Sequence, residues 1–190
     1  MKSMVSGLYC EESRLTDSVN MKRAIVLIGF MGSGKTVIGK RLAKHFHCPF
    51  IDTDRLIEDN EGQAIADIFA VKGEEHFRQL ESACLETLLA GAKERRVIAT
   101  GGGMPVRAEN RLLLKQLGTV VYLQAEAAAL YEHVKHSTTR PLLKTADPQA
   151  TIAALLEERE PIYREVADCV IETGGKSIEQ IVKEITREAL

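Results

Sequence analysis

The 190-residue sequence has no tryptophan, five prolines and four cysteines. The cysteines, Cys10, Cys48, Cys84 and Cys169, lie far apart and form no Cys-x-x-Cys pair. This spacing argues against a zinc site or a redox pair, so free thiols in a reducing compartment are expected. The longest apolar stretch, 24–31, is far shorter than the roughly 20 residues of a membrane-spanning helix. We therefore expect a cytoplasmic protein with no membrane partner.

An excess of charge of one sign is also lacking, because 25 Lys and Arg nearly balance 27 Asp and Glu and the formal net charge is −2. A nucleic-acid binder needs a basic face that releases counterions, so this balance argues against a nucleic-acid partner. A local basic cleft for phosphates stays possible. The length fits one domain, which we expect to span residues 21–190 and to be monomeric. Residues 1–20, with the acidic pair Glu11-Glu12, are expected to be a disordered tail without chemistry; the alternative is a capping or partner-binding role.

Short aliphatic and β-branched runs alternate with longer amphipathic stretches after this tail. The alternation predicts an α/β fold of three layers, with a five-stranded parallel sheet flanked by helices. Leu80, Cys84 and Leu88, for example, recur at helical spacing. Residues 136–148 break the alternation and are expected to form a mobile lid loop. The predicted strands are Ala24–Ile28, Pro49–Asp52, Arg96–Thr100, Thr119–Leu123 and Cys169–Glu172.

A glycine-rich segment follows the first predicted strand and opens a helical pattern. Gly29–Thr36 fits the phosphate-binding pattern G-x-x-x-x-G-K-S/T. Its glycines let backbone N–H groups point at phosphate oxygens, and the helix N-terminus adds partial positive charge. Lys35 is expected to reach the β- and γ-phosphates, while Thr36 places its hydroxyl on Mg²⁺. A chance glycine-rich turn would not need this context. The sequence predicts ATP and Mg²⁺ binding, with Gly32, Ser33 and Gly34 in the nucleotide site.

Two carboxylates, Asp52 and Asp54, stand at the end of the second predicted strand. Ligands bind at the carboxyl edge of open parallel sheets. On an extended chain, residues two apart point to the same side, so both carboxylates can reach the phosphate cleft. One could hold Mg²⁺ through water, and the other could accept the proton of an attacking hydroxyl. On spacing alone, Asp54 could equally be no more than the cap of the next helix.

Other polar features are ambiguous when taken singly. Gly101-Gly102-Gly103 allows close approach of a ligand but could be a flexible turn. Arg78, Arg140 and Arg159 would each, alone, be read as solvated surface charges. His45-Phe46-His47-Cys48 suggests a metal site but has no further ligands at suitable spacing, so we expect none there.

Together, these motifs resemble the shikimate kinase family. They run in the family's order from about residue 22 to the region of Tyr163. The phosphate loop is shared by many nucleotide enzymes, whereas the ordered set D-x-D, F-R, G-G-G and R-P-L-L is far more specific. The segments that carry the resemblance are Gly29–Thr36 with Gly39–Ala43, Asp52–Asp54 with Ile57-Glu58, Ile65–Phe69, Gly73-Glu74 with Phe77-Arg78 and Glu81, Gly101–Gly103, Val120–Leu123, Arg140–Leu143, and Arg159 with Pro161 and Tyr163.

The resemblance implies a P-loop fold like that of nucleoside-monophosphate kinases. The implied reaction is ATP-dependent phosphorylation of the 3-hydroxyl of shikimate, giving shikimate 3-phosphate and ADP in the pathway to aromatic amino acids. Asp54 would hold a substrate hydroxyl and act as the base, and Asp52 would support Mg²⁺ through water. Arg78 and Arg159 would grip the shikimate carboxylate, with Glu81 orienting the arginines.

Further roles follow from the same resemblance. Gly101, Gly102 and Gly103 would line the substrate face, together with Phe69 and Phe77. Arg140, on the lid, would reach the transferring phosphate, so Asp54, Lys35 and Arg140 form the implied catalytic set.

The chain departs from the family pattern at the adenine end. His133 stands where many members place an arginine seven residues before the lid arginine, and Gly174–Ser177 replaces a segment that often carries arginine and proline. His133 and Lys176 are the expected nucleotide contacts there. Imidazole can stack on adenine, so base recognition is expected to be looser rather than absent.

Two other functions remain in view from the sequence. A gluconate kinase would also bind a hydroxylated carboxylate, so Arg78 alone does not decide; the triple glycine and the pair Phe69 and Phe77 favour a cyclic substrate. A nucleotide-binding module without activity would be expected to have lost at least one of the site residues. All of Lys35, Thr36, Asp52, Asp54, Arg78, Arg140 and Arg159 are present.

Overall fold

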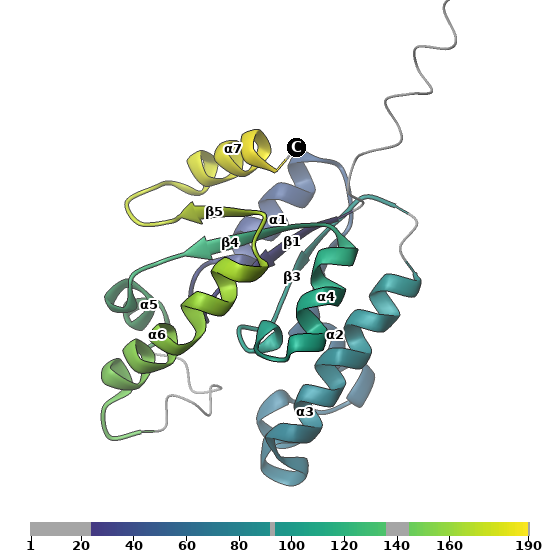
Figure 1. Cartoon of the computed structure of the whole chain (residues 1–190), viewed down its shortest axis with the longest axis vertical. Coiled ribbons are helices and arrows are strands. Elements are labelled where there is room, and N and C mark those ends of the chain that lie inside the picture. Colours follow the sequence, from purple (N-terminus) through teal and green to yellow (C-terminus); the bar gives the residue numbers. More distant parts are fainter. Residues whose placement is uncertain (1–23, 92–93, 136–144, 190) are drawn as a thin grey trace, which may run out of the picture.

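A five-stranded parallel sheet forms the centre of the molecule (Figure 1). The computed structural model describes residues 24–91, 94–135 and 145–189. The strand order is β2-β3-β1-β4-β5, which confirms the predicted sheet. The strands are β1 (Ala24–Ile28), β2 (Phe50–Asp52), β3 (Arg96–Ala99), β4 (Thr119–Gln124) and β5 (Cys169–Glu172).

The central strand β1 is buried and is paired on both sides. Every residue of β1 is buried, as expected for a central strand covered on both faces. Val26 pairs with Ile98 of β3 on one side and with Val120 of β4 on the other. The bounds of β1 and β5 are as predicted, and β2, β3 and β4 each differ at one end by a single residue. Thr100, for example, lies just beyond β3, where its backbone N–H and its hydroxyl still donate to the Leu27 carbonyl oxygen of β1.

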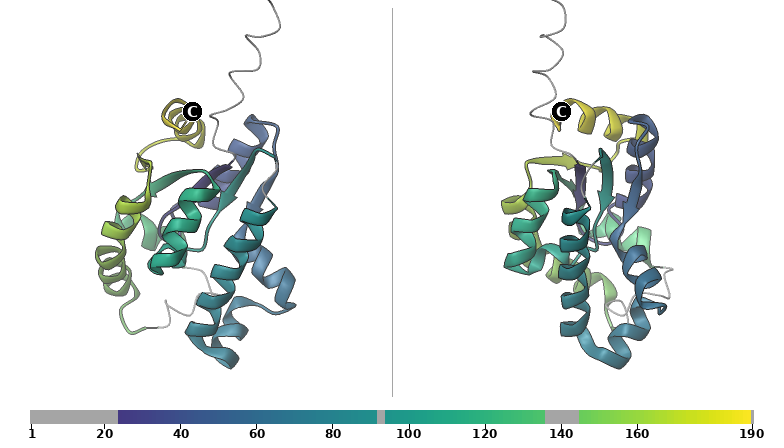
Figure 2. Two further views of the ribbon diagram at one scale, coloured as in Figure 1. Left: turned by 45° about the vertical axis from the view of Figure 1, so that its right-hand side comes forward. Right: turned by 90° about the vertical axis from the view of Figure 1, so that its right-hand side faces the viewer.

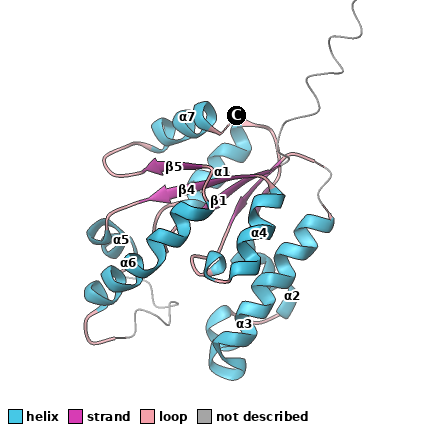
Figure 3. Cartoon of the chain, in the orientation of Figure 1, coloured by secondary structure: helices cyan, strands magenta, loops and turns pink. Residues whose placement is uncertain are grey.

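Helices cover both faces of this sheet (Figure 3). Helices α1 and α7 pack on one face around Leu27 and Val121, and α3, α4 and α6 pack on the other around Val26 and Val120. Figure 2 shows these three layers edge-on. The helices are α1 (Lys35–His45), α2 (Thr53–Glu61), α3 (Ile65–Ala90), the 3₁₀ turn η2 (Met104–Val106), α4 (Ala108–Leu117), α5 (Ala127–Val134), α6 (Pro148–Val166) and α7 (Ile178–Glu188).

Helix α3 is divided by a kink at Gly73. The φ and ψ angles of Gly73 are 81° and 171°, a region that is essentially restricted to glycine. The part before the kink, with α2, projects away from the sheet, and the part after it packs on the sheet face (Figure 1). The kink therefore separates a small helical arm from the core of the fold.

Among the described residues, no helix is both long enough and apolar enough to cross a membrane. The predicted tail, residues 1–20, and most of the predicted lid lie outside the described residues.

Candidate active site

The phosphate loop joins β1 to α1 at the carboxyl edge of the sheet. Gly32 and Gly34 have φ angles of 83° and 89°, and Gly34 is the N-cap residue immediately before α1. The Lys35 ammonium donates hydrogen bonds to the carbonyl oxygens of Gly29 and Phe30, both at 2.8 Å. The loop is therefore already curled around its lysine, with backbone N–H groups at the start of a helix, as phosphate binding requires.

Asp52 links this loop to helix α2. Its Oδ2 atom accepts a hydrogen bond from the Thr36 hydroxyl at 2.8 Å, and its Oδ1 atom accepts one from the Arg55 backbone N–H at 3.4 Å. Asp52 is thus the cap of α2, so Asp54 does not have that role. A hydroxyl and a carboxylate side by side at a phosphate loop are oxygen donors of the kind that Mg²⁺ uses together with phosphates.

A cavity of about 610 Å³ lies over the phosphate loop. Its lining includes the predicted nucleotide contacts Gly32, Ser33, Gly34, Lys35, Thr36, His133 and Lys176. His133 on α5 lies with its Nδ1 atom 2.8 Å from the Gly32 carbonyl oxygen. Lys176, in the turn between β5 and α7, forms an ion pair with Glu184 at 2.7 Å. The expected adenine contacts, His133 and Lys176, are therefore each held by a neighbouring group at the border of this cavity.

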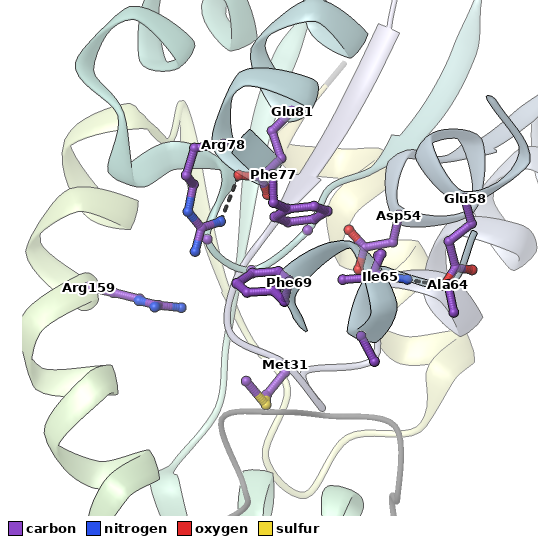
Figure 4. Close-up of a pocket in the computed structure, with 14 residues that line it drawn as sticks. Met31, Asp54, Glu58, Ala64, Ile65, Phe69, Phe77, Arg78, Glu81 and Arg159 are labelled. Carbon is purple, nitrogen blue, oxygen red and sulfur yellow. Dashed lines mark hydrogen bonds and ion pairs between the residues drawn. The ribbon is translucent and has the colours of Figure 1, made fainter. Parts of the chain in front are cut away.

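A second cavity, of about 310 Å³, lies between the helical arm and the sheet (Figure 4). Its lining residues are Met31, Asp54, Glu58, Ala64, Ile65, Ala66, Phe69, Phe77, Arg78, Glu81, Gly101, Gly102, Gly103 and Arg159. Every substrate-binding residue expected from the sequence is among them. Three lining residues, Met31, Asp54 and Gly102, also line the nucleotide cavity. The Asp54 carboxylate therefore lies where the two cavities meet.

Arg78, on α3, is held in this second cavity by two carboxylates. Its guanidinium contacts Glu81 and Glu74, each at 2.7 Å. A methyl group at Gly103 would lie 2.3 Å from the Arg78 Nη1 atom, and one at Gly101 would lie 2.5 Å from Asp54 Oδ1. Only glycine leaves room for these side chains in the positions that they occupy here. The triple glycine is therefore a floor against which the arginine and the aspartate lie, rather than a loose turn.

Arg159 reaches the same cavity from α6, and its guanidinium lies on the same side of the view as that of Arg78, away from Asp54 (Figure 4). It is 8% exposed. Within the part of the chain that the structure describes, no carboxylate forms an ion pair with Arg159, and its buried Nε–H has no hydrogen-bond acceptor. A buried cation with no carboxylate within ion-pair distance is costly unless a ligand supplies one. This arrangement is suited to a bound anion, and a carboxylate matches the planar guanidinium.

The apolar wall of the cavity comes from Phe69 and Phe77, which lie on the two sides of the Gly73 kink. Their ring centroids are 4.8 Å apart. The sequence did not single out Met31 or Ile65 as site residues, and gave Glu58 only as part of a motif. Glu58 accepts a hydrogen bond from the Ile65 backbone N–H at 3.1 Å and so joins α2 to α3. Such a contact between two helices has no signature in residue spacing.

The charge state of Glu81 is set by its burial. Burial raises the pKa of this carboxyl to about 7, more than the attraction of Arg78 lowers it, and the nearby Asp54 adds to the rise. Burial lowers the pKa of Arg78, but Glu81 and Glu74 outweigh it, so the net shift is upward. Arg78 thus stays charged, while Glu81 gains or loses its proton near neutral pH.

The raised pKa of Glu81 predicts a pH-dependent stability. The folded state favours the protonated form of Glu81. The stabilisation that this protonation gives the folded state is therefore complete below the ordinary pKa of about 4.5 and is lost as the pH rises to about 7. Relative to the Glu81→Gln variant, the free energy of unfolding should fall by about 3 kcal/mol over that interval. Urea unfolding of both proteins at several pH values measures this difference. A constant difference would mean that Glu81 ionises normally.

Arg140 and the rest of the lid segment 136–144 lie outside the described residues. The described part already combines a phosphate loop, a carboxylate between two cavities, and two arginines in the smaller cavity. This is the arrangement of a P-loop kinase that phosphorylates a small acidic molecule.

Comparison with known proteins identifies the family. The model of the shikimate kinase family matches residues 31–190. The chain is 43% identical over 163 residues to the shikimate kinase of Caldanaerobacter subterraneus subsp. tengcongensis, covering 86% of this chain and 94% of the relative. It is 45% identical over 157 residues to that of Cupriavidus pinatubonensis, covering 83% and 81%. The chain belongs to the shikimate kinase family.

A solved structure agrees with this assignment. The shikimate kinase from Acinetobacter baumannii in complex with shikimate superposes with a TM-score of 0.84 at 36% identity, covering 90% of this chain and 95% of that one. The predicted fold class and enzyme class are thus confirmed.

Proposed function

We propose that this protein transfers the γ-phosphate of ATP to the 3-hydroxyl of shikimate, giving shikimate 3-phosphate and ADP. Family membership supports an ATP-dependent kinase. The observation that carries the choice of acceptor is the buried guanidinium of Arg159, which shares a cavity with Arg78 and has no carboxylate partner among the described residues. The acceptor cavity, at about 310 Å³, is at the small end of the range for ligand sites and so fits a compact acid.

The acceptor carboxylate binds between Arg78 and Arg159. A guanidinium pairs with a carboxylate through two parallel hydrogen bonds, which fixes the direction of the acid as well as its place. Glu81 and Glu74 hold Arg78 in one orientation. The pair Phe69 and Phe77, with the glycine floor, covers a ring better than a flexible chain. Against gluconate, this geometry favours a cyclic acceptor.

Asp54 accepts the hydroxyl proton of the acceptor. Its position between the acceptor and nucleotide cavities supports this role. As the hydroxyl oxygen attacks the γ-phosphorus, the bond to the bridging oxygen of ADP breaks and the proton passes to the carboxylate. Catalysis otherwise comes from positioning two reactants in line, because little covalent work falls to the protein.

The phosphates bind on the backbone of the loop at Gly32, Ser33 and Gly34, with Lys35 turning from its two carbonyl partners toward the β- and γ-oxygens. Thr36 and, through water, Asp52 would hold Mg²⁺, whose chemistry is to neutralise phosphate charge. No group of three or more His, Cys, Asp or Glu among the described residues could hold a metal unaided. This fits an ion that arrives with its nucleotide.

Three further assignments complete the proposal. Arg140, on a lid of about residues 136–148, neutralises the transferring phosphoryl group and its closure excludes water; these residues are supported by sequence alone. His133 and Lys176 border the adenine. Residues 21–190 act as one cytoplasmic, monomeric kinase domain with neither nucleic acid nor membrane as partner.

An ADP-release assay tests the acceptor directly. Purified protein with MgATP is given shikimate, quinate, gluconate or no acceptor, side by side. Shikimate should stimulate ADP release by about 10²-fold or more over the background without acceptor, since positioned reactants gain a large effective concentration. Turnover with gluconate and none with shikimate would favour the gluconate kinase. Release that no acceptor stimulates would favour a module without kinase activity.

A further inference from the structure

Tyr163 is a buried residue of α6 that none of the roles above uses. Its side chain is 0% exposed, and its hydroxyl donates a hydrogen bond to the Gly102 carbonyl oxygen at 2.6 Å. Tyr163 lies one helical turn after Arg159 on the same helix. We propose that Tyr163 is a positioning residue: its hydroxyl fixes Arg159 relative to the glycine floor and thereby sets where the acceptor carboxylate binds.

Gly102 lies between the phosphate loop and the acceptor cavity. It lines both cavities, and a methyl group on it would lie 3.3 Å from the Met31 backbone nitrogen and 3.4 Å from the Gly29 carbonyl oxygen of the phosphate loop. Its neighbours Gly101 and Gly103 face Asp54 and Arg78. A hydrogen bond to Gly102 therefore connects α6 to the phosphate loop, to the base and to the first arginine at once.

Helix α6 needs such a connection near Arg159. Pro161 stands inside the helix between Arg159 and Tyr163. Proline has no N–H and removes one backbone hydrogen bond from the helix, which weakens the turn that carries Arg159. The side chain of Tyr163 supplies a fixed point directly after that weakened turn. Its ring also packs against Tyr122 of β4, with the ring centroids 5.1 Å apart.

The Tyr163 hydroxyl stays a donor under all ordinary conditions. Burial raises its pKa to about 12, and the neighbouring Arg159 guanidinium opposes this rise through its charge and a hydrogen bond. The phenol is therefore neutral at any pH at which the protein works. The hydroxyl donates to the Gly102 carbonyl oxygen, and its own oxygen faces the Arg159 guanidinium. The same hydroxyl therefore fixes the distance between the guanidinium and the glycine floor.

The Tyr163→Phe variant tests this inference, which rests on the proposed function. Phenylalanine keeps the ring but leaves the buried Gly102 carbonyl without its donor. The KM for shikimate should rise about fivefold to tenfold, the range expected for losing one buried hydrogen bond. The KM for MgATP should change less than twofold, because the phosphate loop keeps its own hydrogen bonds. Incorporation of 3-fluorotyrosine at position 163 retains the donor and should restore the KM for shikimate.

Tyr122→Phe is a matched control. The Tyr122 hydroxyl is buried in the same cluster, but within the described chain it has no hydrogen-bond partner. Its removal should leave both KM values within twofold. Unchanged KM values in Tyr163→Phe, equal effects of the two variants, or no rescue by 3-fluorotyrosine would each overturn the inference. If the wild-type protein turned over no shikimate in this assay, the proposed function would fail instead. ADP binding measured by calorimetry shows that each variant is folded.

Discussion

Replacing Asp54 by asparagine should lower kcat for shikimate phosphorylation by about 10²-fold or more, the usual range for a general base. The amide has the same shape as the carboxylate and can still hold the acceptor hydroxyl, so the KM values for shikimate and MgATP should change little. The residue lies between the two cavities, where the acceptor oxygen must meet the γ-phosphorus. Only the acceptance of the proton is lost.

Asp59→Asn is the control for this change, because Asp59 is on the same helix but exposed, and it pairs with Arg55 at the surface. It should leave kcat unaltered. Steady-state kinetics of both variants with shikimate, at saturating MgATP, measure the two kcat values and test the role of Asp54 as the base. Equal kcat values for Asp54→Asn and the wild type would leave Asp54 as a residue that positions the acceptor and takes no proton.

The Arg159→Met variant should raise the KM for shikimate by about 10²-fold. Two charge-assisted hydrogen bonds to the acceptor carboxylate disappear, and each is worth more than an ordinary hydrogen bond. The thermal unfolding midpoint should not fall. Arg159 is buried without a carboxylate partner among the described residues, and an apolar side chain of similar length avoids that cost. Weaker binding with undiminished stability is the combination that distinguishes a ligand-binding cation from a structural one.

Arg164→Met supplies the comparison, since Arg164 is half exposed on the same helix and already pairs with Glu160. Its KM for shikimate should match that of the wild type. Kinetics and calorimetric unfolding of the two variants complete the test. A large loss of stability in Arg159→Met, with the KM for shikimate unchanged, would show that the guanidinium supports the fold and binds no acceptor.

The sheet was predictable because its strands are short, strongly apolar and separated by amphipathic helices. All five predicted strands were found, with ends that differ by at most one residue. The phosphate loop was predictable for a similar reason, because its glycines, Lys35 and Thr36 follow one another in the chain. Structures of this kind are determined by residues that are adjacent in the chain, so the sequence alone predicts them.

Contacts between distant segments were not predictable from residue patterns. The spacing of Asp52 and Asp54 left open which of them caps α2, and the geometry at Arg55 and Thr36 assigns that role to Asp52. The hydrogen bond of Tyr163 to Gly102 joins residues 61 positions apart. The place of Arg78 and Arg159 in one cavity could be expected only from the family resemblance, since no periodicity relates them.

The close fit at Gly103 has a consequence for how this protein can change over time. Any side chain there would strike the Arg78 guanidinium, with a methyl group already only 2.3 Å away. A substitution would thus push the Arg78 guanidinium from its place beside Glu81 and Glu74, and so impair acid recognition without replacing an arginine. In descendants of this gene, drift at position 103 should be tolerated only after selection for turnover of an acid has ceased, which makes this glycine a marker for copies that have taken up another task.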